Sequence, residues 1–402
     1  MSFFEKSLEL NIKKIYILKV IRWFLIVIPI MVPFYQKIGI NMTQFMLLQS
    51  IFSFSMLAFD VPAGYFADNF GRVKTLLFSS ILSFIGFTFY CFSYHFWQFI
   101  LVQVILGIST ALSSGTDSAL IYDTLLELDK TDDYRKIESK GISLESFSEA
   151  TASIIGGFTA LISLRFNFYI ETIIIFFSIP LALTLKEPTK HLISKRTTVF
   201  ESLNILKDIY KKNESIKWIV WYSSVISAST LMLAWFIQPY FQLVGVPLAF
   251  FGIIWALLNY SVSIFSLFSN RLEKILGEKN SLISFIALIT FSYLALSIID
   301  NKWGILFLFL VYFVRGFNAP IFRNYINDAV TSNVRATVMS LSSFGCRIIF
   351  SILAPIIGFV IDNFNLSLAI LIAGITHFIL AIIPLFFLIK NSGNKFKITH
   401  LS

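Results

Sequence analysis

The chain has 402 residues, of which 56% are hydrophobic and only 14% are charged. Soluble domains average about 25% charged residues, so this composition leaves too little polar surface for a water-soluble globular protein. Disordered chains and disulfide frameworks are also excluded, because apolar residues dominate and the two cysteines, Cys91 and Cys346, lie inside apolar runs. The remaining class is an integral membrane protein.

The net charge of +9 indicates membrane topology rather than a nucleic-acid partner. Lys and Arg cluster in every second connection between apolar runs, whereas the alternate connections offer little beyond Lys37, Arg165 and Lys302. Cytoplasmic loops of membrane proteins carry such an excess of Lys and Arg. Both chain termini are therefore expected in the cytoplasm, with the lipid bilayer around the apolar surface.

Twelve apolar stretches follow one another along the chain, each long enough to cross a bilayer as a helix. They cover 15–36, 43–66, 75–94, 97–121, 141–163, 166–185, 217–242, 247–269, 280–299, 303–326, 336–360 and 366–389. The longest polar stretch follows the sixth. We therefore expect an all-α integral membrane protein with twelve transmembrane helices in two six-helix halves.

The expected domain order follows from this division. It consists of an N-terminal half over 1–185, a cytoplasmic linker over 186–216, a C-terminal half over 217–390 and a cytoplasmic tail over 391–402. Within the linker, the sequence ESLNILKDIYKK places apolar and basic residues on opposite helical faces. This pattern predicts a short amphipathic helix, lying along the inner membrane surface or serving as a solvated linker.

A recognisable motif connects the second and third predicted spans, where the chain reads DVPAGYFADNFGRVK from Asp60 to Lys74. The residues that match the pattern G-x-x-x-D-x-x-G-R-x-K are Gly64, Asp68, Gly71, Arg72 and Lys74. Pattern, loop and twelve-span layout together resemble the major facilitator superfamily over the whole chain. The resemblance implies two six-helix halves that rock around a central site.

Two roles are open for this motif, which comprises Asp60, Gly64, Asp68, Gly71, Arg72 and Lys74. The resemblance implies a conformational latch between the halves that does not touch substrate. In physical terms, Gly64 allows close helix packing, and Asp68 can accept hydrogen bonds at the start of a neighbouring helix, with Arg72 and Lys74 as cationic partners. Alternatively, the basic residues only mark the inner face of the membrane.

Other positions depart from the family pattern or repeat it weakly. Proton-coupled drug exporters of the superfamily commonly have an arginine four residues before a glycine in the fourth span, where this chain has Gln103 before Gly107. A Gly-Pro pair is replaced by Ala152-Ser153 ahead of Gly156-Gly157, which still permits close packing. Arg271 and Gly277 after the eighth span echo the motif and favour an internal repeat.

Three carboxylates, Asp117, Glu145 and Glu149, are expected at one depth near the cytoplasmic end of adjacent spans. Like charges packed closely favour binding of a proton, so these residues are candidates for proton coupling. The alternative is that they pair structurally with basic residues, namely Arg22, Arg135, Lys136 or Lys140. Asp123 is expected at the surface, and Glu171 is expected to pair with Arg165.

Basic and neutral polar residues inside the spans are candidates for substrate binding. Arg315, Arg347 and His377 fall near the middle of their predicted spans, and Arg22 lies about two turns into the first. An arginine in the membrane either pairs with a carboxylate or binds an anion, whereas a histidine is more often a packing residue. Gln238 and Asn259 complete the substrate-binding candidates and are equally ordinary packing residues.

The expected function is secondary active transport by alternating access. The segments 60–74 and 115–123 resemble those of bacterial efflux-type members, which favours proton-coupled antiport that exports a small amphipathic compound. The alternative is a transporter of an anionic metabolite or siderophore-like molecule bound by the membrane arginines. A non-transporting sensor is less favoured. No phosphate loop, HExxH or metal-spaced Cys/His cluster is present in the sequence, so neither enzyme activity, a cofactor nor a metal is expected. A monomer in a bacterial plasma or inner membrane is expected.

Overall fold

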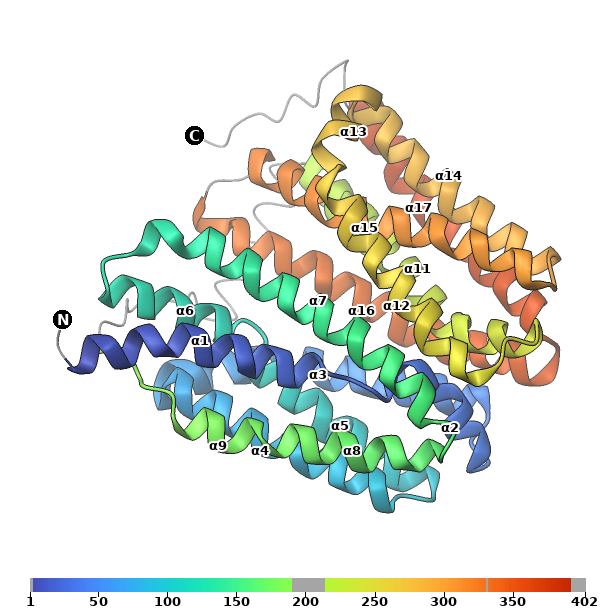
Figure 1. Ribbon diagram of the computed structural model, residues 1–402. Helices are drawn as coiled ribbons and strands as arrows, with labels where there is room; N and C mark the ends of the chain where they lie inside the picture. The colour runs from blue at the N-terminus through green and yellow to red at the C-terminus, as the bar shows by residue number, and fades with distance from the viewer. Residues whose placement is uncertain (1–2, 190–213, 330–331, 392–402) are drawn as a thin grey trace. The chain divides into compact units, whose positions relative to one another are not determined.

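The computed structural model describes residues 3–189, 214–329 and 332–391, and these residues form helices joined by short connections, without strands (Figure 1). The α-helices are α1 (Phe3–Trp23), α2 (Met31–Lys37), α3 (Met42–Phe70), α4 (Arg72–Phe92), α5 (Phe96–Ser113), α6 (Thr116–Glu127), α7 (Tyr134–Thr159), α8 (Leu164–Phe176), α9 (Ser178–Leu183), α11 (Glu214–Leu243), α12 (Leu248–Leu267), α13 (Ser269–Leu276), α14 (Glu278–Ile298), α15 (Ile305–Ala329), α16 (Ser332–Asn363) and α17 (Leu366–Asn391). Three 3-10 turns, η1 (Ile28–Ile30), η2 (Thr131–Asp133) and η3 (Lys302–Gly304), join them. The predicted amphipathic linker helix and most of the predicted tail lie outside the described residues.

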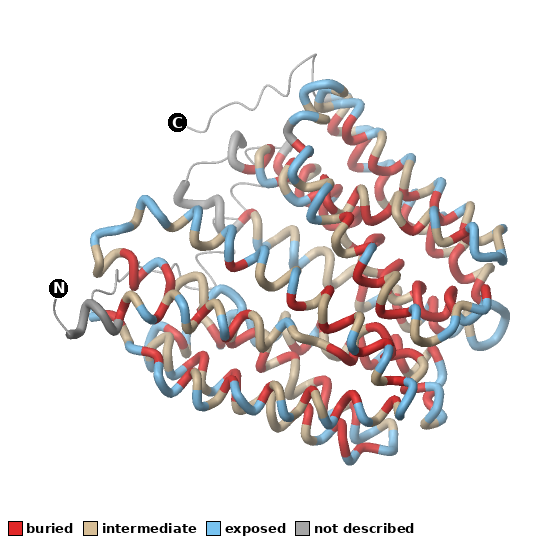
Figure 2. Tube along the Cα trace, in the orientation of Figure 1, coloured by how far each residue is buried: buried red, intermediate tan, exposed pale blue. Residues whose placement is uncertain are grey.

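Within the described part of the chain, eleven helical stretches are long and apolar enough to cross a membrane. The additional long helix is α7, which has 26 residues and a strongly charged first half. The all-helical membrane fold predicted from the sequence is confirmed. Large apolar side chains such as Phe54, Trp97 and Ile173 are exposed on the helices, as a lipid-facing surface requires. Figure 2 shows buried and exposed residues alternating along most helices.

The helices group into two compact units. Unit 1 contains α1, α2, most of α3 and all of α4 to α9, together with residues 247–257 at the start of α12. Unit 2 contains residues 41–50 at the start of α3, α11, the rest of α12 and α13 to α17.

The first span is interrupted rather than continuous. Helix α1 ends at Trp23, and the chain becomes helical again only at η1 and α2. Pro29 explains the interruption, because its ring lacks an N–H group and would clash with the carbonyl four residues earlier in a continuous helix. Within this interruption, the N–H groups of Phe24, Ile28 and Ile30 bond to nearby carbonyls of the same segment, whereas the N–H of Ile26 bonds to another helix.

Equivalent glycines begin one helix in each unit. Gly71 precedes α4 with φ of 95°, and Gly277 precedes α14 with φ of 77°. These left-handed backbone conformations favour glycine. The agreement supports the internal repeat suggested by the echo of the motif around Arg271.

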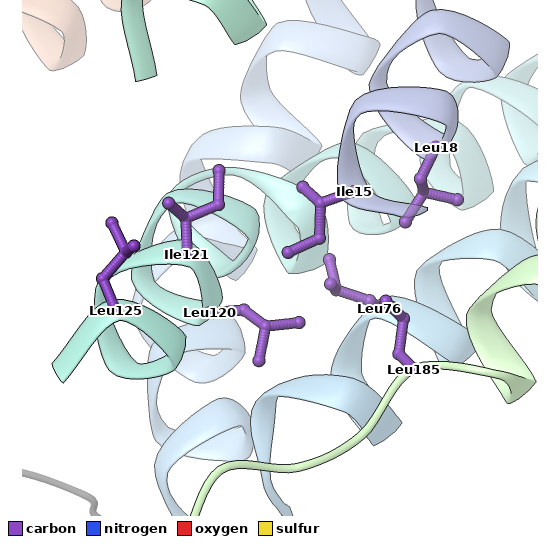
Figure 3. Packing of buried hydrophobic residues seen from close by; sticks show 7 residues of the cluster. All are labelled: Ile15, Leu18, Leu76, Leu120, Ile121, Leu125 and Leu185. Carbon is purple, nitrogen blue, oxygen red and sulfur yellow. The ribbon is translucent and has the colours of Figure 1, made fainter. Parts of the chain in front are cut away.

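Apolar side chains from three helices pack together in unit 1. Figure 3 shows Ile15 and Leu18 of α1 near Leu76 of α4 and near three residues of α6. The full cluster consists of Ile15, Leu18, Leu76, Leu120, Ile121, Leu125 and Leu185. This packing fixes α1 beside α6.

Candidate functional site

The ammonium group of Lys19 lies at the centre of a carboxylate cluster in unit 1. Lys19 Nζ is 2.8 Å from Asp117 Oδ2, 2.7 Å from Glu145 Oε1 and 3.8 Å from Glu138 Oε1. Lys19 comes from α1, Asp117 from α6 and both glutamates from α7. Since Lys19 is only 5% exposed, these ionic contacts operate where water screens them weakly. The structure therefore joins three helices through one buried cation.

Neighbouring residues hold this cluster in position. A Cβ atom at Gly141 of α7 would lie 3.3 Å from Lys19 Cδ and 3.4 Å from Cε, so glycine leaves room for the lysine stem. The hydroxyl of Ser118 donates to Glu138 Oε1 at 2.6 Å, and the hydroxyl of Ser148 donates to the Val20 carbonyl at 2.7 Å. These contacts fix α6 and α1 against α7 on both sides of the lysine.

Arg22, one turn after Lys19, bonds to α4 instead of the carboxylates. Its Nη2 donates to the Leu76 carbonyl at 3.2 Å and to the hydroxyl of Ser79 at 3.4 Å. No ion pair within 4 Å joins it to a described acidic residue. The basic residues named from the sequence as structural partners of Asp117 and Glu145 were therefore wrong. Lys19, rather than Arg22 or the basic residues early in α7, is the partner.

Glu149 lies on the same helix as Glu145 but has a different partner. The indole Nε1 of Trp255 donates to Glu149 Oε1 at 3.2 Å, and both residues belong to unit 1. Glu149 also forms contacts beyond this one. The structure thus brings two of the three predicted carboxylates to one cation and places the third against an indole.

The family motif forms its contacts with residues outside the motif. The carboxylate of Glu187 accepts hydrogen bonds from the backbone N–H groups of Arg72 and Val73, each at 2.8 Å, and so caps the start of α4. Arg72 Nε lies 2.9 Å from Asp123 Oδ2. The predicted surface position of Asp123 is wrong, because this residue is 1% exposed. Burial is possible because Arg72 supplies the opposite charge.

The remaining motif residues occupy the end of α3 and the beginning of α4. Asp60, Asp68 and Lys74 are exposed, and Gly64 is half-buried. Asp68 has an interaction partner, and the start of α4, the helix that follows it in the chain, is capped by Glu187. A corresponding cap exists in unit 2, where Asp362 Oδ1 and Oδ2 accept from the backbone N–H groups of Met42 and Thr43 at 2.9 and 2.7 Å.

Gln103, which replaces the arginine of many exporters, belongs to a neutral buried cluster. Its Nε2 donates to the hydroxyl of Tyr90 at 3.0 Å and to that of Tyr35 at 3.3 Å. The two tyrosine hydroxyls are 2.8 Å apart. Gln103 is 3% exposed, so its side chain stabilises contacts between α2, α4 and α5 and brings no charge to this position.

The pair Gly156-Gly157 allows the close packing expected from the sequence. A Cβ atom at Gly156 would lie 2.0 Å from the carbonyl oxygen of Ile26 in the interrupted first span. A Cβ atom at Gly157 would lie 2.8 Å from the carbonyl oxygen of Ala249. Only glycine permits such approach of α7 to these backbones.

Arg165 and Glu171 both lie on α8 but do not form the predicted ion pair. Arg165 donates to the carbonyl oxygens of Cys91 and Ser93 at 2.7 and 2.9 Å, at the end of α4. Cationic side chains commonly bind the last carbonyls of a helix in this way. Glu171 instead accepts a hydrogen bond from the backbone N–H of Ile26 at 2.8 Å. The predicted pair is wrong because each residue is occupied by backbone groups.

The candidate residues of unit 2 are distributed over five helices. Arg315 of α15 and Arg347 of α16 are half-buried, and both lie within electrostatic range of Cys346. His377 of α17 is buried, and its Nδ1 lies 2.7 Å from the Ala373 carbonyl. Gln238 of α11 is fully buried, Asn259 of α12 is half-buried, and both have contacts in the structure.

Sequence reasoning missed Lys19, Glu138 and Glu187. For Lys19 a signal was available, since a lysine within the first apolar run, one turn before Arg22, is itself an ionisable group inside a span. Glu187 offered no such signal, because its role depends on the return of the chain after α9 to the start of α4. Across the described ranges, no group of three or more His, Cys, Asp or Glu residues is arranged to hold a metal ion.

Comparison with known proteins gives a consistent picture. The sequence model of the Major Facilitator Superfamily matches residues 16–353. No curated protein matches the chain. Among solved structures, the nucleoside transporter NupG superposes with a TM-score of 0.75 and 13% identity, covering 97% of this chain and 100% of that chain.

Two further solved structures share the fold over nearly the whole chain. The D-xylose–proton symporter has a TM-score of 0.73 and 13% identity, covering 96% of this chain and 97% of that chain. A bacterial homologue of the human lysosomal transporter Spinster has a TM-score of 0.72 and 16% identity, with the same coverage. At these identities the similarity concerns the fold, not the substrate.

Proposed function

Because the chain belongs to the Major Facilitator Superfamily and has a multi-span membrane transporter fold, we propose that it is a proton-coupled secondary transporter working by alternating access. The sharing of Lys19 between Asp117 and Glu145 supports this proposal most strongly. Ionisable residues within membrane spans commonly belong to ion or proton pathways. The Lys19 cluster is the proposed coupling site.

Charge balance explains how this cluster binds a proton. Lys19 carries one positive charge and is surrounded by three carboxylates, of which two are within 2.8 Å of its ammonium. One bound proton reduces the excess negative charge in a poorly screened site. Lys19 keeps a carboxylate partner whether the proton is present or absent. Both states of the transport cycle therefore retain a paired lysine.

We propose export of a small amphipathic compound as the direction of transport. The resemblance of the segments 60–74 and 115–123 to efflux-type members supports this choice, whereas the neutral Gln103 cluster lacks the charge found in many drug–proton exchangers. A symporter shares the fold. The direction of proton movement is therefore the decisive measurement.

The first test uses inside-out vesicles with an acidic interior. Lipophilic cations, neutral amphiphiles and organic anions are added in turn, and proton release is recorded for the wild type and Asp117→Asn. Antiport predicts release with one class of compound and loss of that release in the variant. No release with any class, while a labelled anion still accumulates, would contradict proton-coupled export.

A matched control separates the Lys19 cluster from ordinary ion pairs. Lys130 Nζ lies 2.7 Å from Glu9 Oε1, but these side chains are 50% and 40% exposed. Water screens such a pair strongly, so its contribution to stability is small. Lys130→Gln is therefore expected to retain proton release at the wild-type rate.

The second candidate function is transport of an anionic compound through unit 2. It is supported by two half-buried arginines, Arg315 and Arg347. No described acidic residue lies within 4 Å of Arg315 as an ion-pair partner. Binding of a labelled organic anion, lost in Arg315→Lys without loss of stability, is the expected result because the planar guanidinium binds oxyanions through two parallel bonds.

The latch and the membrane topology are separate proposals. We propose that the motif segment 60–74 lies on the cytoplasmic side with both termini, and that it stabilises one state of the transport cycle. Asp68→Asn is then expected to slow transport while membrane insertion and expression remain normal. Unchanged transport by Asp68→Asn would contradict the latch role. The topology is tested by introducing single cysteines near residue 68 and labelling them with an impermeant reagent in right-side-out and inside-out vesicles. A monomer is the proposed functional unit.

A further inference from the structure

The interruption of the first span is bonded by two polar residues of α8. The carboxylate of Glu171 accepts from the backbone N–H of Ile26 at 2.8 Å. One turn earlier on the same helix, Asn167 Nδ2 donates to the carbonyl oxygens of Gly156 and Ile26 at 2.8 and 3.4 Å. Both side chains are 0% exposed. Unit 1 therefore contains a second buried polar site, built on other residues than those of the Lys19 cluster.

One oxygen of Glu171 has no bonding partner among the described residues. Oε2 receives the Ile26 N–H, whereas Oε1 receives none, and no described basic residue lies within 4 Å as an ion-pair partner. An ionised carboxylate can accept about four hydrogen bonds, and an isolated buried one is strongly disfavoured. A proton on Oε1 removes the charge and converts this oxygen into a donor.

An acceptor for such a donor is present on the same face of α8. Asn167 Oδ1 is buried and has no partner among the described residues, and residues four apart on a helix are neighbours. We infer that Glu171 is a proton-binding residue at the interruption of the first span, distinct from the Lys19 cluster. In one state of the transport cycle the carboxylate binds a proton and becomes a neutral carboxyl. In the other state it releases this proton to water.

The charged and titratable groups on the surrounding helices are engaged elsewhere. These groups are Arg22 of α1, Tyr35 of α2, Tyr90 and Cys91 of α4, Glu149 of α7 and Arg165 of α8. Arg22 and Arg165 bond to carbonyl oxygens of α4, the tyrosines bond to each other, and the Cys91 thiol lies 3.3 Å from the hydroxyl of Thr172. Glu149 accepts from Trp255. None of these contacts supplies Glu171 with a counter-charge.

The position of Glu171 couples its proton to the backbone. Hydrogen bonds to an ionised carboxylate are roughly twice as strong as those to a neutral group. Loss of the proton therefore tightens the bond to the Ile26 N–H, and gain of the proton loosens it. Since α7 approaches the carbonyl of the same residue, Ile26, through Gly156, the protonation state acts on the junction of the first span, α7 and α8.

Infrared difference spectroscopy of the purified full chain in liposomes tests this assignment directly. Glu171→Gln keeps an oxygen that accepts from the Ile26 N–H but cannot release a proton. We expect the wild type to show the carbonyl stretch of a protonated carboxyl near neutral pH, shifted in heavy water, and Glu171→Gln to lose it. Identical spectra for the two proteins in this region would overturn the assignment.

Transport measurements distinguish a proton-binding role from a purely structural one. Glu171→Gln is expected to lose the pH dependence of transport, whereas Glu171→Asp keeps a titratable group and is expected to retain a shifted profile. An unchanged pH profile in Glu171→Gln would contradict the inference. The inference rests on the transporter fold and not on the Lys19 cluster, because the infrared band must persist in Asp117→Asn even if that cluster carries no coupled proton.

Discussion

Arg72 Nε and Asp123 Oδ2 lie 2.9 Å apart and join the start of α4 to α6. Asp123 is 1% exposed, so the contact holds a buried carboxylate beside the cation of the family motif. The segment that carries the motif is thereby fixed to the helix that also carries Asp117. This contact and the Lys19 cluster stabilise opposite ends of the same short helix.

Asp123→Asn is predicted to destabilise unit 1 and to slow transport. The substitution removes the charge opposite Arg72, and loss of one partner from a buried ion pair typically costs about 3–5 kcal/mol. Thermal unfolding in detergent is expected to show a lower midpoint. The double variant with Arg72→Gln is expected to lose less than the sum of the single losses; full additivity would show that the two residues do not interact.

Lys19→Met is predicted to be more damaging than neutralisation of the lysine together with its two nearest carboxylates. Removal of the ammonium leaves Asp117 and Glu145 without their cation, and loss of one partner from a buried ion pair typically costs about 3–5 kcal/mol. The triple variant Lys19→Met, Asp117→Asn, Glu145→Gln is expected to recover much of this stability while remaining inactive in proton-coupled transport. Equal instability of the single and triple variants would indicate a packing role for the lysine.

Gly156→Ala is predicted to prevent correct folding of unit 1. The added Cβ would lie 2.0 Å from the Ile26 carbonyl oxygen, so either α7 or the interrupted span must move. The expected result is loss of monodisperse protein on size-exclusion chromatography. Ile155→Ala on the same helix removes a 39% exposed side chain and serves as the control, with near-normal recovery.

Glu187→Ala is predicted to weaken the start of α4. Its carboxylate accepts from the N–H groups of Arg72 and Val73, and loss of a helix cap costs about 1 kcal/mol. Faster hydrogen exchange at these two amides than in the wild type is the expected observation. Lys186→Ala changes an exposed neighbour and is expected to leave that exchange unaltered; unchanged exchange in Glu187→Ala would contradict the capping role.

Much of the fold was predictable because apolar runs in a membrane protein have few alternatives to helices. The run from 141 to 163 was recognised although α7 is too polar to count as a span by hydropathy. Part of its charge is neutralised inside unit 1, where Glu138 and Glu145 lie near Lys19, whereas its basic residues are exposed. Hydropathy alone therefore does not identify α7 as a span, whereas its place in the regular alternation of spans and loops does.

Less of the site could be predicted, because partners depend on backbone geometry. Depth along the helices correctly placed Asp117 beside Glu145, but it could not show that Lys19 would reach both. The expected partner of Glu171 was Arg165, the nearest opposite charge in sequence. Glu171 instead accepts from the backbone N–H of Ile26, which is free because the first span is interrupted there. Side-chain types in the sequence do not indicate which backbone N–H groups are free, so this partner could not be predicted.

The Lys19 cluster also constrains how the protein is made. The first span carries Lys19 and Arg22 when it is inserted into the membrane. Glu145, a partner of Lys19, follows it by 126 residues and is therefore synthesised much later. A lysine or arginine at the centre of a helix costs about 2.5–3.5 kcal/mol during insertion. The nascent first helix must therefore hold its charges near the membrane–water boundary, or wait in the translocon, until α6 and α7 have been synthesised. Assembly of unit 1 is thus expected to be completed only after its carboxylates arrive.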